Sequence, residues 1–151
     1  MSVEPLQFRL YIVRAPLKAV AGGKLWSPAA EELLMMTAAT ESHLGRYIRQ
    51  VGGIALGDFQ MEPATFHDCN RYLKLRPLDG FTPHDDPEIL MYDRAAATIY
   101  ARVKYLMDPD PIPAPNDLPG LAAYYKRVYN SHLGKGSVEK ALADYAKYVV
   151  G

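Results

Sequence analysis

The stretch Ser27–Ser42, SPAAEELLMMTAATES, decides the fold. It opens with a hydroxyl cap, a proline at the first helical position and two acids near the positive end of the helix dipole, which is how strong helices begin. We therefore predict a helix from Pro28 to about Ser42. Residues three, four and seven positions apart share one face of a helix. That face carries Ala30, Leu34, Thr37, Ala38 and Glu41.

Glu41 is the last member of this otherwise apolar stripe. A carboxyl group at the end of an apolar face is partly removed from water, which disfavours its charged form and raises its pKa. A carboxylic acid that stays protonated near neutral pH can donate a proton to a glycosidic oxygen. The alternative on the helical pattern alone is that Glu41 lies past the useful end of the helix and is solvated.

The rest of the chain also predicts a mainly α fold. Asp86-Pro87 repeats the signal of a cap followed by proline, and we expect the helix that follows it to be the central buried one. The glycines at 52, 53 and 57 predict a turn or a small irregular hairpin near residues 50–60. The proline-rich segment 108–119 predicts an extended connection. The expected helices are 6–20, broken or restarted near Pro16, then 63–74, 87–107, 120–129 and 137–150.

Composition limits the class of protein. A chain of 151 residues fits one domain, residues 1–151. Lys plus Arg and Asp plus Glu both total 17, so no overall charge favours nucleic acid or an anionic membrane, and a substrate must be recognised locally. Cys69 alone cannot form an internal disulfide. Glu4 and Arg9 argue against a signal peptide, and no apolar run reaches the roughly 18 residues of a membrane span, so we expect a protein made in the cytoplasm without membrane insertion.

Three short elements follow one another along the chain. The pair Glu41-Ser42 ends the first helix, and Gly57, Gln60, Pro63 and Thr65 form a Gly-x-x-Gln-x-x-Pro-x-Thr element. The pair Tyr129-Asn130 lies near the end. Together these elements resemble the superfamily of lysozyme-like lytic transglycosylases and goose-type lysozymes. The sequence as a whole looks like that of bacteriophage-encoded members. The chain departs from the pattern after Asn130, because the glycine of the third element comes late, at Gly134 and Gly136.

The resemblance implies a lysozyme-like domain that acts on the glycan strands of peptidoglycan, without cofactor or metal, as a monomer or as a part of the virion. It implies Glu41 as the catalytic residue, and Ser42, Gly57, Gln60, Tyr129 and Asn130 as residues that contact or position the substrate. Gly57 also suits a close approach of backbone to a sugar ring, and the Gln60 amide offers a donor and an acceptor. The four histidines are scattered and show no metal-ligand spacing.

The number of acids bears on the reaction. Glycosidases generally need two carboxylates, yet no Asp or Glu lies between Ser42 and Gly57. Asp58 is the candidate second acid, and we expect Glu62 to cap the following helix. Lytic transglycosylases, as the resemblance implies, use a single glutamate as acid and then as base and form anhydro-muropeptides. We therefore predict a transglycosylase for phage lysis or cell entry, which reaches the cell wall after release or with the virion. The alternatives are a muramidase that uses Asp58 and a non-catalytic glycan-binding or virion structural protein on the same fold.

Overall fold

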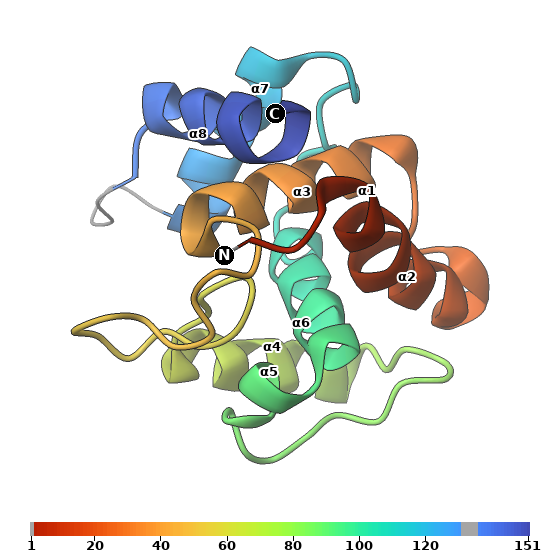
Figure 1. Ribbon diagram of the computed structural model, residues 1–151. Helices are drawn as coiled ribbons and strands as arrows, with labels where there is room; N and C mark the ends of the chain where they lie inside the picture. Colours follow the sequence, from red (N-terminus) through yellow and green to blue (C-terminus); the bar gives the residue numbers. More distant parts are fainter. Residues whose placement is uncertain (1, 131–135) are drawn as a thin grey trace.

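Helix α3, Pro28–Ser42, lies at the centre of the computed structural model, which describes residues 2–130 and 136–151 (Figure 1). Its start is as predicted, because the Ser27 hydroxyl accepts a hydrogen bond from the Ala30 N–H at 3.0 Å. Eleven of its fifteen residues are buried. The helix is therefore surrounded by the rest of the fold and has almost no solvent face.

The first residues form one helical run. It consists of α1 (Pro5–Gln7), the π-helical segment η1 (Phe8–Arg14) and α2 (Ala15–Ala19), and a 3₁₀ turn, η2 (Ala21–Gly23), follows. The predicted interruption near Pro16 takes the form of a change in hydrogen-bond pattern at Ala15. Proline has no N–H to donate, so a switch from π to α geometry beside it continues the helix without breaking it.

The single helix predicted over 87–107 is wrong, because the segment forms α5 (Ile89–Tyr92) and α6 (Arg94–Leu106). Asp93 separates them with an extended backbone (φ −122°, ψ 98°), and its carboxylate accepts a hydrogen bond from the Ala96 N–H at 2.9 Å. A second N-cap inside the helical pattern therefore starts a new helix. Helix α6 also lies near the centre, but α3 is buried over a larger share of its length.

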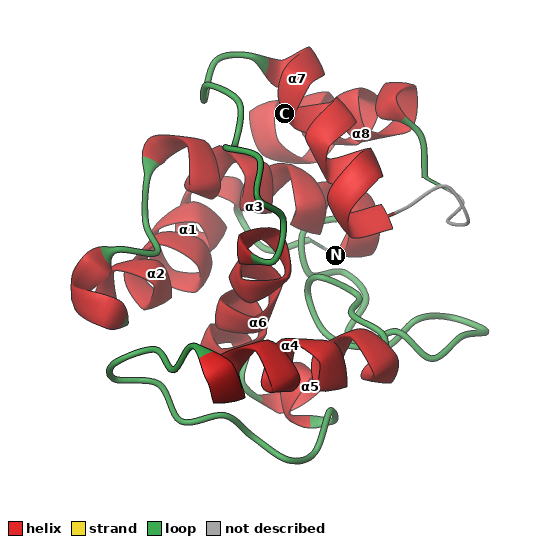
Figure 2. Cartoon of the chain, turned by 180° about the vertical axis from the view of Figure 1, so that it is seen from behind, coloured by secondary structure: helices red, strands yellow, loops and turns green. Residues whose placement is uncertain are grey.

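The remaining predicted helices are present. They are α4 (Pro63–Leu75), α7 (Leu118–Tyr125), which continues into π-helical η3 (Lys126–Asn130), and α8 (Val138–Asp144), which continues into η4 (Tyr145–Val150). The expected irregular hairpin consists of two isolated antiparallel bridges, Arg49–Leu56 and Leu56–Met61. Over the described residues the fold is thus mainly helical and contains no extended strand (Figure 2).

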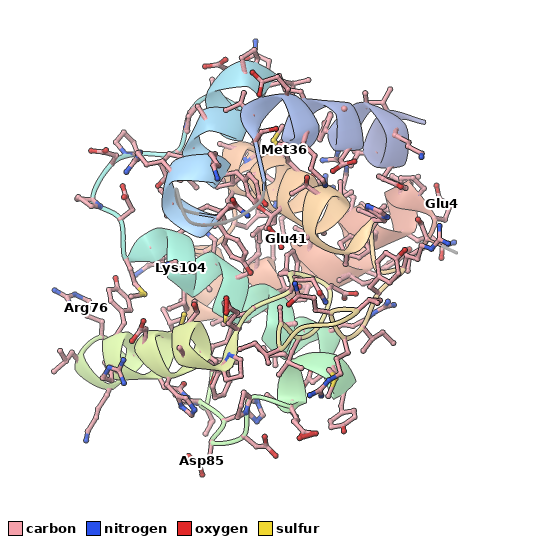
Figure 3. All side chains as sticks on the ribbon, turned by 90° about the vertical axis from the view of Figure 1, so that its left-hand side faces the viewer. Glu4, Met36, Glu41, Arg76, Asp85 and Lys104 are labelled. Carbon is pink, nitrogen blue, oxygen red and sulfur yellow. The ribbon has the colours of Figure 1, made fainter. Side chains whose placement is uncertain are left out.

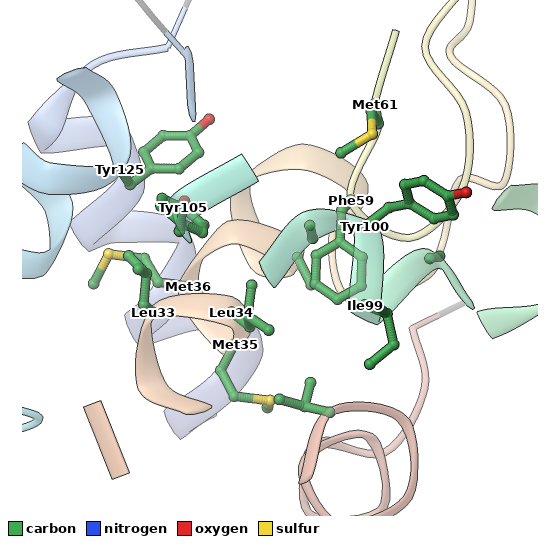
Figure 4. Packing of buried hydrophobic residues seen from close by; sticks show 14 of the residues in the cluster. Leu33, Leu34, Met35, Met36, Phe59, Met61, Ile99, Tyr100, Tyr105 and Tyr125 are labelled. Atoms are coloured by element: carbon green, nitrogen blue, oxygen red, sulfur yellow. The ribbon is translucent and has the colours of Figure 1, made fainter. Parts of the chain in front are cut away.

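The buried apolar side chains form one cluster around α3, which packs against η1, α6, α7, α8 and η4, while α4 packs against α6. Leu33 to Met36 point to different sides of α3, as Figure 4 shows. Tyr100, Tyr105 and Tyr125 are among the largest fully buried side chains, so several of the eleven tyrosines serve the core. None of the helices in the described ranges is long and apolar enough to cross a membrane.

Candidate active site

A cleft of about 370 Å³ lies at the carboxyl end of α3 (Figure 3). Its walls come from α3, from the loop and start of α4 that follow it, from α6, from the end of α7 with η3, and from the start of α8. The lining residues are Thr40, Glu41, Gln50, Ala55, Gln60, Met61, Glu62, Thr65, Lys104, Tyr125, Tyr129, Asn130, Gly136 and Lys140. Four of the predicted site residues, Glu41, Gln60, Tyr129 and Asn130, therefore meet in one cleft although they lie far apart in sequence.

Glu41 reaches this cleft because α3 ends abruptly just after it. The N–H groups of His43 and Leu44 both donate to the Ala38 carbonyl, and three successive residues, His43, Leu44 and Gly45, have left-handed backbone (φ 52°, 58° and 83°). Left-handed geometry is uncommon for histidine and leucine and is typical of strained functional segments. The turn ends the helix while Glu41 still lies over the buried core.

The environment of the Glu41 carboxyl agrees with the desolvation that the sequence predicts. Burial raises its pKa, and the negative charge of Glu62 acts in the same direction. Hydrogen bonds from Tyr125 and Asn130 and the positive charge of Lys140 act in the opposite direction without cancelling the rise. Glu41 is therefore a carboxyl group that holds its proton at higher pH than an exposed glutamate does.

Tyr125 is the closest partner of Glu41, and sequence reasoning did not find it. Its hydroxyl donates to Glu41 Oε2, while burial and the charge of Glu41 raise the pKa of Tyr125, so that it remains a donor. Its ring stacks on Tyr129, with 6.1 Å between ring centroids, and Tyr129 stacks on Tyr105. The only signal in the sequence was the spacing of four residues between Tyr125 and Tyr129, which places both on one helical face.

Three other predicted residues lie in the cleft with part of their polar groups already engaged. The Tyr129 hydroxyl donates to the Phe59 carbonyl at 2.7 Å, so the ring is what this residue offers a ligand. The Gln60 amide nitrogen donates to the Gly57 carbonyl at 2.9 Å, from a left-handed backbone with φ 45°. The Asn130 side chain bonds Glu41 and accepts hydrogen bonds from Lys126 Nζ and the Gly136 N–H, which fixes its orientation.

Ser42 and Gly57, predicted to contact or position the substrate, do not line the cleft. Ser42 is fully buried, and its hydroxyl donates to the Ala38 carbonyl and accepts from the Gly45 N–H at 2.8 Å. Its role is to close the end of α3. Gly57 has φ 80°, and a Cβ added there would lie 2.3 Å from the Leu90 carbonyl oxygen. The glycine therefore allows the chain to pack closely against Leu90.

Asp58, the predicted candidate for the second acid, does not line the cleft either. It is 3% exposed, and its Oδ2 lies 3.1 Å from Arg94 Nε. Burial raises the pKa of Asp58, while the charge and hydrogen bond of Arg94 oppose that rise. The ion pair joins the loop after α3 to the first turn of α6, which is a structural role.

Glu62 behaves differently from its expected role as a cap. It occupies the position before α4, but its side chain makes no capping hydrogen bond, and it lines the cleft as an exposed residue. Lys104 and Lys140, which sequence reasoning also missed, line the same cleft from α6 and α8. The cleft thus combines two carboxyl groups with two lysines.

Neither a metal cluster nor a known relative adds to this description. Within residues 2–130 and 136–151 no three His, Cys, Asp or Glu side chains gather in a way that could hold a metal ion. Gly134, named above for the third sequence element, lies outside the described residues. No protein-family model matches the chain, and neither the curated proteins nor the solved structures contain a significant match.

Proposed function

We propose that this chain is a lysozyme-like enzyme that cleaves the β-1,4 bond between N-acetylmuramic acid and N-acetylglucosamine in peptidoglycan, with Glu41 as the general acid. The main support is the position of Glu41: a carboxyl group with a raised pKa that lines a polar cleft and is held by Tyr125 and Asn130. A proton donor with a raised pKa in a cleft is what cleavage of a glycosidic bond requires.

The proposed reaction is transglycosylation. Glu41 gives its proton to the glycosidic oxygen as the bond to the anomeric carbon breaks, and the N-acetylglucosamine end leaves as an alcohol. The carboxylate then takes the proton of the muramic C6 hydroxyl, whose oxygen closes on the anomeric carbon. Glu41 ends protonated, an anhydro sugar forms and no water is consumed. Tyr125 and Asn130 donate hydrogen bonds to the carboxylate between the two steps.

Hydrolysis is the second candidate reaction, and the position of Glu62 favours it. A hydrolase needs a second carboxylate for a water or for the sugar cation. Glu62 lines the same cleft, and its negative charge influences Glu41, whereas Asp58 is buried in an ion pair. If the enzyme hydrolyses the bond, Glu62 is the residue that takes this role.

Digestion of purified peptidoglycan followed by mass analysis of the fragments tests the proposal. Fragments with anhydro ends, lighter by one water, support transglycosylation, whereas reducing ends identify a hydrolase. Glu41→Gln should lower the rate about 10²–10⁴-fold, the usual contribution of a general acid. Glu88→Gln, an exposed acid outside the cleft, is the matched control and should leave the rate unchanged.

Two further results would decide between a transglycosylase, a hydrolase and a non-catalytic protein. A loss of about 10²–10⁴-fold in Glu62→Gln, together with reducing ends, assigns Glu62 as the second catalytic carboxylate. No cleavage by the native chain would overturn the proposal and would leave a non-catalytic glycan-binding or virion protein. We further propose that the cleaving enzyme serves phage lysis or entry, reaching the wall after release from the cytoplasm or with the virion.

A further inference from the structure

Lys104 is a half-buried cation in the wall of the cleft. It lies in the last turn of α6 and lines the same cavity as Glu41, with both residues labelled in Figure 3. Its ammonium group carries three hydrogen-bond donors. A cation placed in a cleft acts on a ligand at short range, which matters in a chain whose net charge is zero.

No acidic side chain of the described residues forms an ion pair or a hydrogen bond with Lys104, although its charge helps to lower the pKa of Asp108. The Asp108 carboxylate is bound instead by Arg127, with 2.8 Å between Nη1 and Oδ2. The segment 131–135 contains neither Asp nor Glu. The donors of Lys104 are therefore free of a carboxylate from residues 2–130 and 136–151.

The other lysine that lines the cleft forms an ion pair within the protein. Lys140 Nζ lies 2.6 Å from Asp144 Oδ2, and the Thr40 hydroxyl donates to the same carboxylate oxygen at 2.6 Å. Lys140 is thus part of the wall that joins α3 to α8. Of the two cleft lysines, Lys104 is therefore the one that forms no ion pair with an acid of the described residues.

We propose that Lys104 binds a carboxylate of the substrate, so that the cleft prefers anionic muramic-acid-containing strands to neutral glycans. This inference rests on the proposed function. The carboxylate belongs either to the lactyl group of the muramic residue, in strands without peptide, or to the peptide attached there. Both sources present the same chemistry to an ammonium group, which binds carboxylates as a point charge with several donors.

A lysine in the last turn of a helix also interacts favourably with the helix dipole, so a matched control is needed. Lys74 supplies it, because it lies in the last turn of α4, a helix of the same length as α6, and does not line the cleft. Lys74→Met removes the same charge from the last turn of a helix of the same length. Any loss that Lys104→Met shows beyond Lys74→Met belongs to the cleft.

The experiment measures kcat/KM on soluble peptidoglycan strands in three forms. The first carries intact peptides, the second has had its peptides removed by an amidase, which frees the lactyl carboxylates, and the third has all carboxylates converted to neutral methylamides. Lys104→Met should lower kcat/KM about tenfold on at least one anionic form, the scale of one charge-assisted hydrogen bond, and less than about twofold on the neutral form. The form that shows the loss identifies the source of the carboxylate.

The outcomes separate this inference from the proposed function. If the native chain cleaves none of the three forms, the function itself is wrong. If the native chain cleaves them and Lys104→Met loses the same factor on the neutral form as on the anionic forms, or no more than Lys74→Met, the inference is overturned while the function stands. Melting temperatures show whether the variants are folded, and Lys104→Gln replaces Lys104→Met if the latter is not.

Discussion

Replacing Glu41 with Gln should make the protein more stable at neutral pH, because the native fold buries a group that ionises there. Burial raises the pKa of Glu41 above its ordinary value of 4.5, in spite of the hydrogen bonds from Tyr125 and Asn130. The folded state therefore binds this proton more tightly than the unfolded chain does. The associated stability is fully present below the pKa of the unfolded chain and is lost as the pH rises towards the pKa in the folded state.

The size of the effect follows from this linkage. For one proton the free energy of unfolding changes by at most about 1.4 kcal/mol per pH unit between the two pKa values. We therefore expect Glu41→Gln to gain stability relative to the native chain as the pH rises from 4 to 7, by no more than about 1.4 kcal/mol per pH unit. The hydrogen bonds from Tyr125 and Asn130 lower this pKa, so their loss is already part of the pH-dependent difference. A change in packing contributes equally at each pH, so the pH-dependent part reports the titration of Glu41.

Urea denaturation from pH 4 to pH 8 measures this difference without any assay of activity. Glu88→Gln, at an exposed position, corrects for the general effect of removing one negative charge. A difference between Glu41→Gln and the native chain that does not grow with pH would refute the reasoning. It would mean that Glu41 is solvated, which is the alternative that the helical pattern alone left open.

Three other variants test separate parts of the structure. Tyr125→Phe removes a hydrogen bond that lowers the pKa of Glu41, so the proposed activity should persist to higher pH than in the native chain, as a pH–rate profile would show. Gly57→Ala should lower the free energy of unfolding in urea by about 2–4 kcal/mol, because its φ of 80° and the Leu90 carbonyl leave no room for a Cβ. Burial alone would raise the pKa of Glu31, but hydrogen bonds from its cationic and indole neighbours lower it from 4.5 to about 2. That carboxylate contributes about 3 kcal/mol of stability above its unfolded pKa, which is lost as the pH falls from about 4.5 to 2 and which Glu31→Gln should lack.

For each of these three variants, one outcome would contradict the prediction. A pH–rate profile of Tyr125→Phe that keeps its position, or moves to lower pH, would show that the hydroxyl does not stabilise the Glu41 carboxylate. Native stability in Gly57→Ala would contradict the close packing against Leu90. An unchanged acid-unfolding curve in Glu31→Gln would show that the native chain gains nothing from this carboxylate between pH 4.5 and 2.

Helix starts were readable from the sequence where the capping signal is local and complete. Ser27-Pro28 marks the start of α3, and Pro63 marks that of α4. Asp93 likewise caps the start of α6. It is followed by arginine and lies inside a helical pattern, so its neighbours in the sequence did not distinguish it from a surface acid. The Asp86-Pro87 signal, by contrast, lies ahead of a helix that begins only at Ile89.

The candidate site also contains one residue that local sequence could predict and others whose position depends on the tertiary fold. Glu41 could be predicted because the apolar stripe that desolvates it belongs to its own helix. Ser42, Gly57 and Asp58 were predicted as site residues, and each is next to or near a cleft residue in sequence, but none of them lines the cleft. Which side a residue faces depends on the left-handed turns at 43–45 and at Gly57 and on the helices that pack there, and a linear pattern does not contain that information.

The opposed influences on Glu41 also account for how one carboxyl could act twice. A general acid must hold its proton until the bond breaks and must then be tolerated as an anion until it accepts another proton. Burial and the charge of Glu62 serve the first requirement, and the donors on Tyr125 and Asn130 with the charge of Lys140 serve the second. Burial favours the protonated acid, and the donors favour the carboxylate. The combination suits the proton cycle of a transglycosylase, in which the same oxygen atoms give and take the proton.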